Sequence, residues 1–268
     1  MSEEFKVNDL TVRIEQDQDP LNPREEWDCH VGTMVCWHRR YNLGDKHDLK
    51  DSGELYASLF DSCEPTDEEI REVLSVIIKS EEGQQDYCQF FQNSRGWQSK
   101  LDTRRDFVRE YAANWEYIPQ EVKHAISEVV LSYHTILPLY LYDHSGITMN
   151  TSGFMCGWDS GQVGYIYVSH KKLAKEWGQG IDEPVVRRDT QEILSPSLRE
   201  YAVDILKSEV EVYDQYLTGD IWGYVIEDEE GNHIDSCWSM LGREYCEEEA
   251  KSQAEWFSQE QNRPTYCI

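Results

Sequence analysis

Residues 221–238 read IWGYVIEDEEGNHIDSCW, and they carry the clearest structural signal in the chain. Two runs rich in β-branched and aromatic residues, 221–226 and 233–238, flank the sequence DEEGN at 228–232. Two such runs joined by a short turn with Gly and Asn are typical of a β-hairpin. The sequence therefore predicts two antiparallel strands connected by an acidic turn.

One helix is expected before this hairpin in the sequence and another after it. Ser195 and Pro196 have the residue types that begin a helix, and Gly219 is placed to end it after about Leu217. A last helix is expected from about Arg243 to Glu260. This order predicts an acidic helix-hairpin-helix domain over 191–268, which leaves 1–190 as an α+β core with a loop-rich N-terminal part.

The expected core mixes strands with amphipathic helices. Thr66 and Glu69 have the spacing of a capping box, which favours a helix over 66–81. Further helices are expected over 103–116, 119–133 and 170–177, and strands over 10–14, 32–38, 136–142, 147–149 and 163–168. Residues 82–102 receive no assignment. The predicted class is α+β, with a mixed or antiparallel sheet packed with helices.

Composition restricts the class of protein. Apolar residues make up 39% of the chain, with nine Trp and sixteen Tyr, so we expect a folded chain despite its charge. No run of about 18 apolar residues is present, which predicts no membrane span. The polar start of the chain does not resemble a signal peptide, and the eight cysteines lack a compact framework. We therefore expect a cytoplasmic protein whose cysteines are reduced.

Charge is the strongest compositional feature. The chain has 25 basic and 52 acidic residues, a formal net charge of −27. Residues 200–260 hold seventeen acidic and three basic residues, a local net charge of −14. Nucleic-acid affinity comes largely from basic groups that release counterions, so direct nucleic-acid binding by this region is excluded. The charge instead favours a positively charged partner.

Two sets of residues are candidates for binding that partner. The acidic set is Glu227, Asp228, Glu229 and Glu230 in the hairpin turn and Glu247, Glu248 and Glu249 in the last helix. The aromatic set is Tyr165 and Tyr167, which share one face of a strand, together with Trp158. Tyr and Trp dominate the hot spots of protein interfaces. For the acidic set, the alternative is a solvated surface without a partner. For the aromatic set, the alternative is packing in the core.

Catalytic and metal-binding patterns are weak. Cys29, His30, Cys36 and His38 lie within ten residues, but their spacing matches no common zinc module. Asp143, His144 and Asp159 surround a loop without the Gly-x-Ser-x-Gly turn of hydrolases, and no phosphate-binding glycine pattern is present. We expect no catalysis, cofactor or metal. The alternative is a metal-dependent enzyme that uses these Cys, His and Asp residues.

Three segments carry a resemblance to a known family. They are GTMVCWHRRYNLGD at 32–45, YDHSGI at 142–147 and WDSGQVGYIYVS at 158–169. They resemble a widespread group of bacteriophage proteins, most without an assigned function, and that group resembles the phage inhibitors of the Gabija defence system. The resemblance spans nearly the whole chain.

The resemblance implies a non-enzymatic inhibitor in the host cytoplasm. Such a protein assembles around the host nuclease complex, as a homo-oligomer, and denies it DNA. Tyr165 and Tyr167 would then be interface residues, and the acidic surface would lie against a basic DNA-binding surface. The alternative that the charge leaves open is an acidic DNA mimic directed at restriction enzymes.

Overall fold

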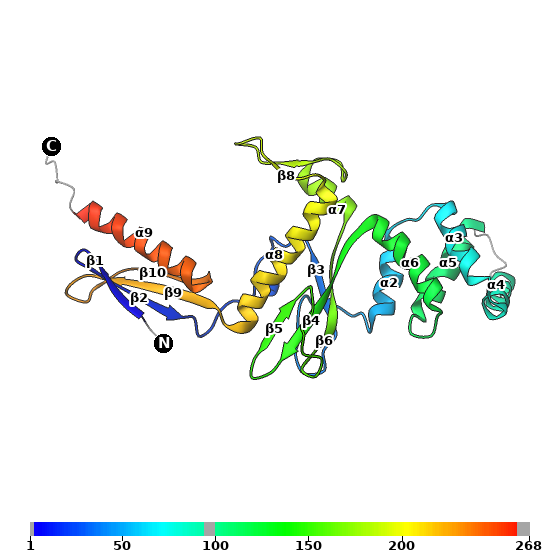
Figure 1. Cartoon of the computed structure of the whole chain (residues 1–268), viewed down its shortest axis with the longest axis horizontal. Helices are drawn as coiled ribbons and strands as arrows, with labels where there is room; N and C mark the ends of the chain where they lie inside the picture. The colour runs from blue at the N-terminus through cyan, green and yellow to red at the C-terminus, as the bar shows by residue number, and fades with distance from the viewer. Residues whose placement is uncertain (1–2, 94–99, 262–268) are drawn as a thin grey trace. The chain divides into compact units, whose positions relative to one another are not determined.

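A computed structural model describes residues 3–93 and 100–261, and its course is drawn in Figure 1. Helices and antiparallel sheets confirm the predicted α+β class. The chain divides into two compact units. Unit 1 contains 1–30, 139–162 and 206–268, and unit 2 contains 31–138 and 163–205. The sequence predicted a single domain boundary near residue 190. The structure instead builds each unit from segments that lie far apart in sequence.

Unit 1 contains a four-stranded antiparallel sheet. Its strands are β1 (Glu3–Val7), β2 (Leu10–Gln16), β9 (Ile221–Glu227) and β10 (His233–Leu241), in the order β1-β2-β9-β10. The strands β9 and β10 pair antiparallel, and β2 pairs along the other edge of β9, with Val12 opposite Ile226. The N-terminal strands therefore belong to the same sheet as the C-terminal ones, and residues 191–268 do not form a domain by themselves.

The last helix, α9 (Arg243–Gln261), lies along one face of this sheet (Figure 1). The buried side chains between sheet and helix are Leu10, Val12, Ile14, Tyr224 and Ile226 from the strands and Cys246, Ala250 and Ala254 from the helix. Each large aliphatic side chain in such a layer stabilises the fold by about 2 kcal/mol. The other face of the sheet carries alternating polar residues such as Arg13, as expected for a sheet covered on one side.

A buried ion pair ties two further elements of unit 1 together. Arg24 lies in the short helix α1 (Pro23–Glu26), and its side chain is 1% exposed. Its Nη1 donates to Oε2 of Glu209 at 2.9 Å, on the long helix α8 (Leu198–Thr218). Gly219, at φ 74°, follows α8 as the sequence predicted. The helix begins later than expected, because residues up to Ser195 form the strand β8 (Ile193–Ser195), paired with β7 (Val185–Val186).

The second four-stranded sheet has the order β3-β6-β4-β5. Its strands are β3 (Thr33–Cys36), β6 (Ser160–Ser169), β4 (His134–Asp143) and β5 (Ile147–Asn150). The strands β3 and β6 approach closely where Cys36 faces Gly164. A Cβ atom at Gly164 would lie 2.0 Å from the carbonyl oxygen of Val35, so only glycine fits this position.

Helices form most of unit 2. They are α2 (Ser52–Ser62), α3 (Asp67–Ile77), α4 (Glu81–Asn93), α5 (Lys100–Ala113), α6 (Gln120–Tyr133) and α7 (His170–Trp177). Their shared core includes Phe60, Ile70 and Ile126, all fully buried. The capping box of Thr66 and Glu69 is confirmed. The expected helix over 66–81 is shorter than predicted, since α3 ends at Ile77.

In the part of the chain that the structure describes, no helix has the length and apolar character needed to cross a membrane.

Candidate protein-docking surface

The helix α9 carries its small residues inward and two of its three large aromatic residues outward, whereas Phe257 packs against the core. Cys246, Ala250 and Ala254 repeat at intervals of four and are completely buried against the sheet. Tyr245 and Trp256 are 54% and 51% exposed. Because eleven residues make three helical turns, these two rings share one face of the helix. An ordinary amphipathic helix places its large apolar side chains in the core, and the exposed rings of Tyr245 and Trp256 depart from that pattern.

Two exposed carboxylates lie on the same face as the two rings. Glu248, Ser252 and Glu255 are exposed on the helix between Tyr245 and Trp256. We call these five residues the α9 outer face. The face joins aromatic surface with negative charge, a combination suited to a basic protein partner.

The two basic residues of α9 are engaged within unit 1. Arg243 forms an ion pair with Glu3 and stacks over the ring of Trp222. The Nζ atom of Lys251 donates to Glu247 at 2.6 Å and lies 5.2 Å from the ring centre of Phe5. These contacts compensate the positive charge of both side chains inside the unit. The negative charge of the α9 outer face is therefore left for a partner.

The acidic turn between β9 and β10 is partly structural. Glu227 binds Arg13 at 3.2 Å. Hydrogen bonds from the side-chain amide and the backbone N–H of Asn232, at 2.9 and 2.8 Å, lower the pKa of Asp228. Asp228 therefore shapes the turn, as Asp does in many turns. Glu229 and Glu230 are exposed at the tip, where Glu230 also accepts a hydrogen bond from Asn232.

The three predicted acids of α9 lie in different surroundings. The hydrogen bond from Lys251 lowers the pKa of Glu247. Glu249 is half-buried beside the sheet, where it adds to the effect of burial in raising the pKa of Tyr224. Only Glu248 lies on the α9 outer face. Tyr245 and Trp256 were missed by the sequence reasoning, although small residues spaced every four positions were a signal that this helix buries its small side.

The predicted aromatic set falls into two environments. Trp158 is 98% exposed in the loop that follows β5. Tyr165 and Tyr167 are half-buried and pack against the helical core of unit 2. The ring of Tyr165 meets Tyr56 edge-on at 5.9 Å, and the ring of Tyr167 meets His134 edge-on at 6.2 Å. The two tyrosines thus take part in core packing, and their interface role stays a prediction.

The candidate metal ligands are engaged in other ways. His30 Nε2 lies 2.6 Å from the carbonyl oxygen of Pro23, and His38 Nδ1 accepts from the backbone N–H of Tyr41 at 3.2 Å. Cys36 is buried, whereas Cys29 is exposed. Within residues 3–93 and 100–261, no group of three or more His, Cys, Asp and Glu is placed to hold a metal ion.

The candidate catalytic loop brings its residues together. His144 Nδ1 lies 3.2 Å from Oδ2 of Asp159, and the backbone N–H of Asp143 donates to the carbonyl oxygen of Asp159 at 2.8 Å. The Sγ atom of Cys156 is 4.0 Å from the same Asp159 oxygen. A nucleophilic thiol needs the imidazole beside it, whereas here the carboxylate lies between the two. The arrangement matches an exposed contact between a histidine and a carboxylate, and such surface pairs typically contribute below about 1 kcal/mol.

Comparison with protein-family models, with curated proteins and with solved structures finds no match to this chain. The resemblance to the phage group therefore remains a prediction from the three sequence segments.

Proposed function

We propose that the chain is a non-catalytic binding protein whose α9 outer face docks on a basic, nucleic-acid-binding surface of another protein. The observation that carries this proposal is the outward position of Tyr245 and Trp256 among carboxylates on a helix that buries its small residues. The family resemblance names the partner as a host nuclease complex of the Gabija type. The protein would then be a phage anti-defence factor that acts in the host cytoplasm as a homo-oligomer.

Two physical effects support such docking. Buried Tyr and Trp rings supply much of the binding energy at interfaces, often about 2 kcal/mol or more each. Negative charge facing a basic surface accelerates association and makes it sensitive to salt. The formal net charge of −27 supplies this second effect. A nuclease surface covered in this way would no longer reach the phosphates of DNA.

Inhibition of the purified nuclease complex tests the proposal. The protein should block DNA cleavage without turnover, in proportion to the amount that co-purifies with the complex. The double variant Tyr245→Ala/Trp256→Ala should weaken inhibition about 1,000-fold, since about 2 kcal/mol for each ring corresponds to a loss of roughly 30-fold. The matched control is Tyr117→Ala, which removes an 84% exposed ring from unit 2. Equal inhibition by the double variant and the wild type would remove the α9 outer face from the proposal.

Variants that remove negative charge distinguish pure DNA mimicry from docking through the aromatic rings. Mimicry depends on carboxylates alone, and Glu227, Asp228 and Glu247 already have partners within the chain. We therefore expect Glu248→Gln/Glu255→Gln to slow association and reduce its salt dependence, with less loss of affinity than the aromatic variant. A greater loss from the two glutamates than from the two rings would favour mimicry. Absence of any bound nuclease would refute the partner implied by the resemblance.

A further inference from the structure

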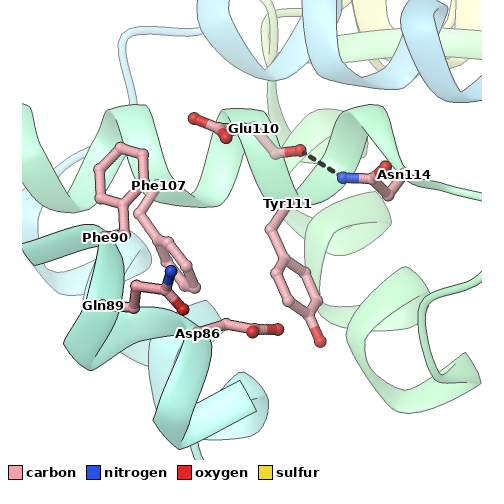
Figure 2. A pocket seen from close by; sticks show the side chains of 7 residues that line it. All are labelled: Asp86, Gln89, Phe90, Phe107, Glu110, Tyr111 and Asn114. Atoms are coloured by element: carbon pink, nitrogen blue, oxygen red, sulfur yellow. Dashed lines mark hydrogen bonds between the residues drawn. The ribbon is translucent and has the colours of Figure 1, made fainter. Parts of the chain in front are cut away.

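Unit 2 contains an aromatic cavity between α4 and α5 (Figure 2). Its volume is about 250 Å³. Phe107 is 3% exposed and forms the floor, with its ring centre 5.4 Å from that of Phe90 and 5.6 Å from that of Tyr111. Three rings from two helices thus line one small hollow.

Carboxylates lie at the rim of the same cavity. Asp86 from α4 lies near the Tyr111 ring in Figure 2, and Glu110 lies on α5. Burial, followed by the charges of Asp86 and Glu82, raises the pKa of Tyr111. Of the described residues that line this cavity, none is Lys, Arg or His. The charged residues of this described lining are thus both acidic, and three of its side chains are aromatic.

A larger hollow of about 710 Å³ adjoins the first and shares Phe90 and Glu110 with it. It adds Asp61 and Asp106 to its lining. Among its described lining residues the basic one is Arg109, whose Nη1 lies 3.5 Å from Oδ2 of Asp61. Arg105 also lies 3.9 Å from Asp61, so the charge of this carboxylate is compensated within the chain. The two hollows together form an acidic track across α2, α4 and α5 with an aromatic end.

We propose that this track binds a linear alkyl polyamine, with one terminal ammonium group in the aromatic cavity. Aromatic faces attract cations, and the carboxylates supply the matching charge. At about 30 Å³ for each water, 250 Å³ corresponds to roughly eight waters, which suits an ammonium group on a short alkyl stem. Further ammonium groups of the same molecule would lie near Asp106 and Glu110 in the larger hollow.

Calorimetric titration of the full chain with spermidine tests this proposal. We expect saturable binding that 1,8-octanediol, a neutral molecule of similar length, does not show. The ring signals of Tyr111 should shift during the same titration in NMR spectra. Asp86→Asn/Glu110→Gln should weaken binding about five- to tenfold, because exposed charge pairs contribute modestly.

The matched control is Glu229→Gln/Glu230→Gln, which removes the same charge from the β9–β10 turn. It should change the affinity for spermidine by less than twofold. Equal weakening by both double variants would show non-specific attraction to an acidic protein and would overturn the proposal. The proposal would also be overturned if a tetra-arginine peptide shifted the NMR ring signals of Tyr111 and spermidine did not. No nuclease enters these measurements, so their failure leaves the proposed function standing.

Discussion

His170 is buried in unit 2 among polar groups. Its Nε2 lies 3.2 Å from Oγ1 of Thr135, and its Nδ1 lies 3.1 Å from the carbonyl oxygen of Ser132. Burial, followed by the positive charge of Arg199, lowers its pKa to about 4. The imidazole is therefore neutral in the folded protein at pH values where the unfolded chain already protonates it.

Stability should consequently fall in mild acid. A depressed histidine pKa contributes stability that is complete above about pH 6.5 and is lost as pH falls towards 4. Between pH 7.5 and 5.5 we expect His170 to reduce the free energy of unfolding by about 1 kcal/mol. Urea unfolding at both pH values measures this loss. Burial also lowers the pKa of His134, which acts in the same direction.

His170→Asn isolates the contribution of one ring. This variant should show a pH dependence smaller than that of the wild type by about 1 kcal/mol over the same range. An unchanged pH dependence would mean that His170 titrates normally in the folded protein. The imidazole NMR signals would then report a pKa near 6.5.

Single residues also show the limits of the sequence reasoning. Strand alternation correctly placed Tyr165 and Tyr167 on one face, but it could not say that helices cover that face. Asp228 was predicted as a partner-binding acid, which stays a prediction, and its three hydrogen bonds that shape its own turn were not foreseen. In both cases the residue type correctly indicated a role in contacts. The residues that make those contacts could not be predicted from the sequence.

At the scale of elements, two glycines of β6 provide a matched pair. A Cβ atom at Gly164 would meet the carbonyl oxygen of Val35 at 2.0 Å, whereas one at Gly161 would meet nothing within 4 Å. Gly164→Ala must therefore push β3 away from β6. We expect a loss of about 2–3 kcal/mol in the free energy of unfolding, against about 0.5 kcal/mol or less for Gly161→Ala.

Thermal or urea unfolding of both variants, with the wild type as reference, measures this difference. Similar stabilities for the two alanine variants would mean that β3 and β6 are farther apart in solution than the structure places them.

Elements with their own local signals were the ones that could be predicted. The capping box fixed the start of α3, and Gly219 fixed the end of α8. The strand β1 has an acidic, alternating sequence and was missed, because its pairing with β2 comes from the sheet. The helix α9 was expected, but its orientation was not. Four-residue spacing of Cys246, Ala250 and Ala254 was a signal for its buried side, whereas the sheet that covers this side comes from distant parts of the chain.

For the whole molecule, charge is the dominant property. A formal net charge of −27 on 268 residues produces repulsion that opposes compaction. Salt screens such repulsion, with a Debye length near 10 Å at 0.1 M. We therefore expect the melting temperature to rise by several degrees between 10 and 500 mM NaCl. Calorimetry or circular dichroism in a chloride series measures the rise.

A fall in melting temperature over that range would contradict this expectation. It would mean that attractive pairs such as Arg24 with Glu209 outweigh the repulsion. Chloride is preferred over sulfate in this test, because sulfate stabilises folded proteins by a separate effect on hydration.

Local sequence patterns could not predict which distant strands pair with each other. Both strands of the 221–238 hairpin were predicted, yet the pairing of β9 with β2 joins residues such as Arg13 and Glu227, 214 positions apart. No periodicity encodes a contact at that separation. The expected boundary at residue 190 followed from reading the chain in order, whereas the units are built by returning segments.

That long-range pairing has a consequence for synthesis on the ribosome. Translation at about 5–20 residues per second makes β2 wait roughly 10–40 s before β9 emerges. During this interval the edge of the β1–β2 pair is exposed, while the helices from α2 to α6 form one continuous stretch that can fold early. Nascent chains arrested before residue 221 should therefore protect the helices from protease and leave the first 16 residues open to chaperones.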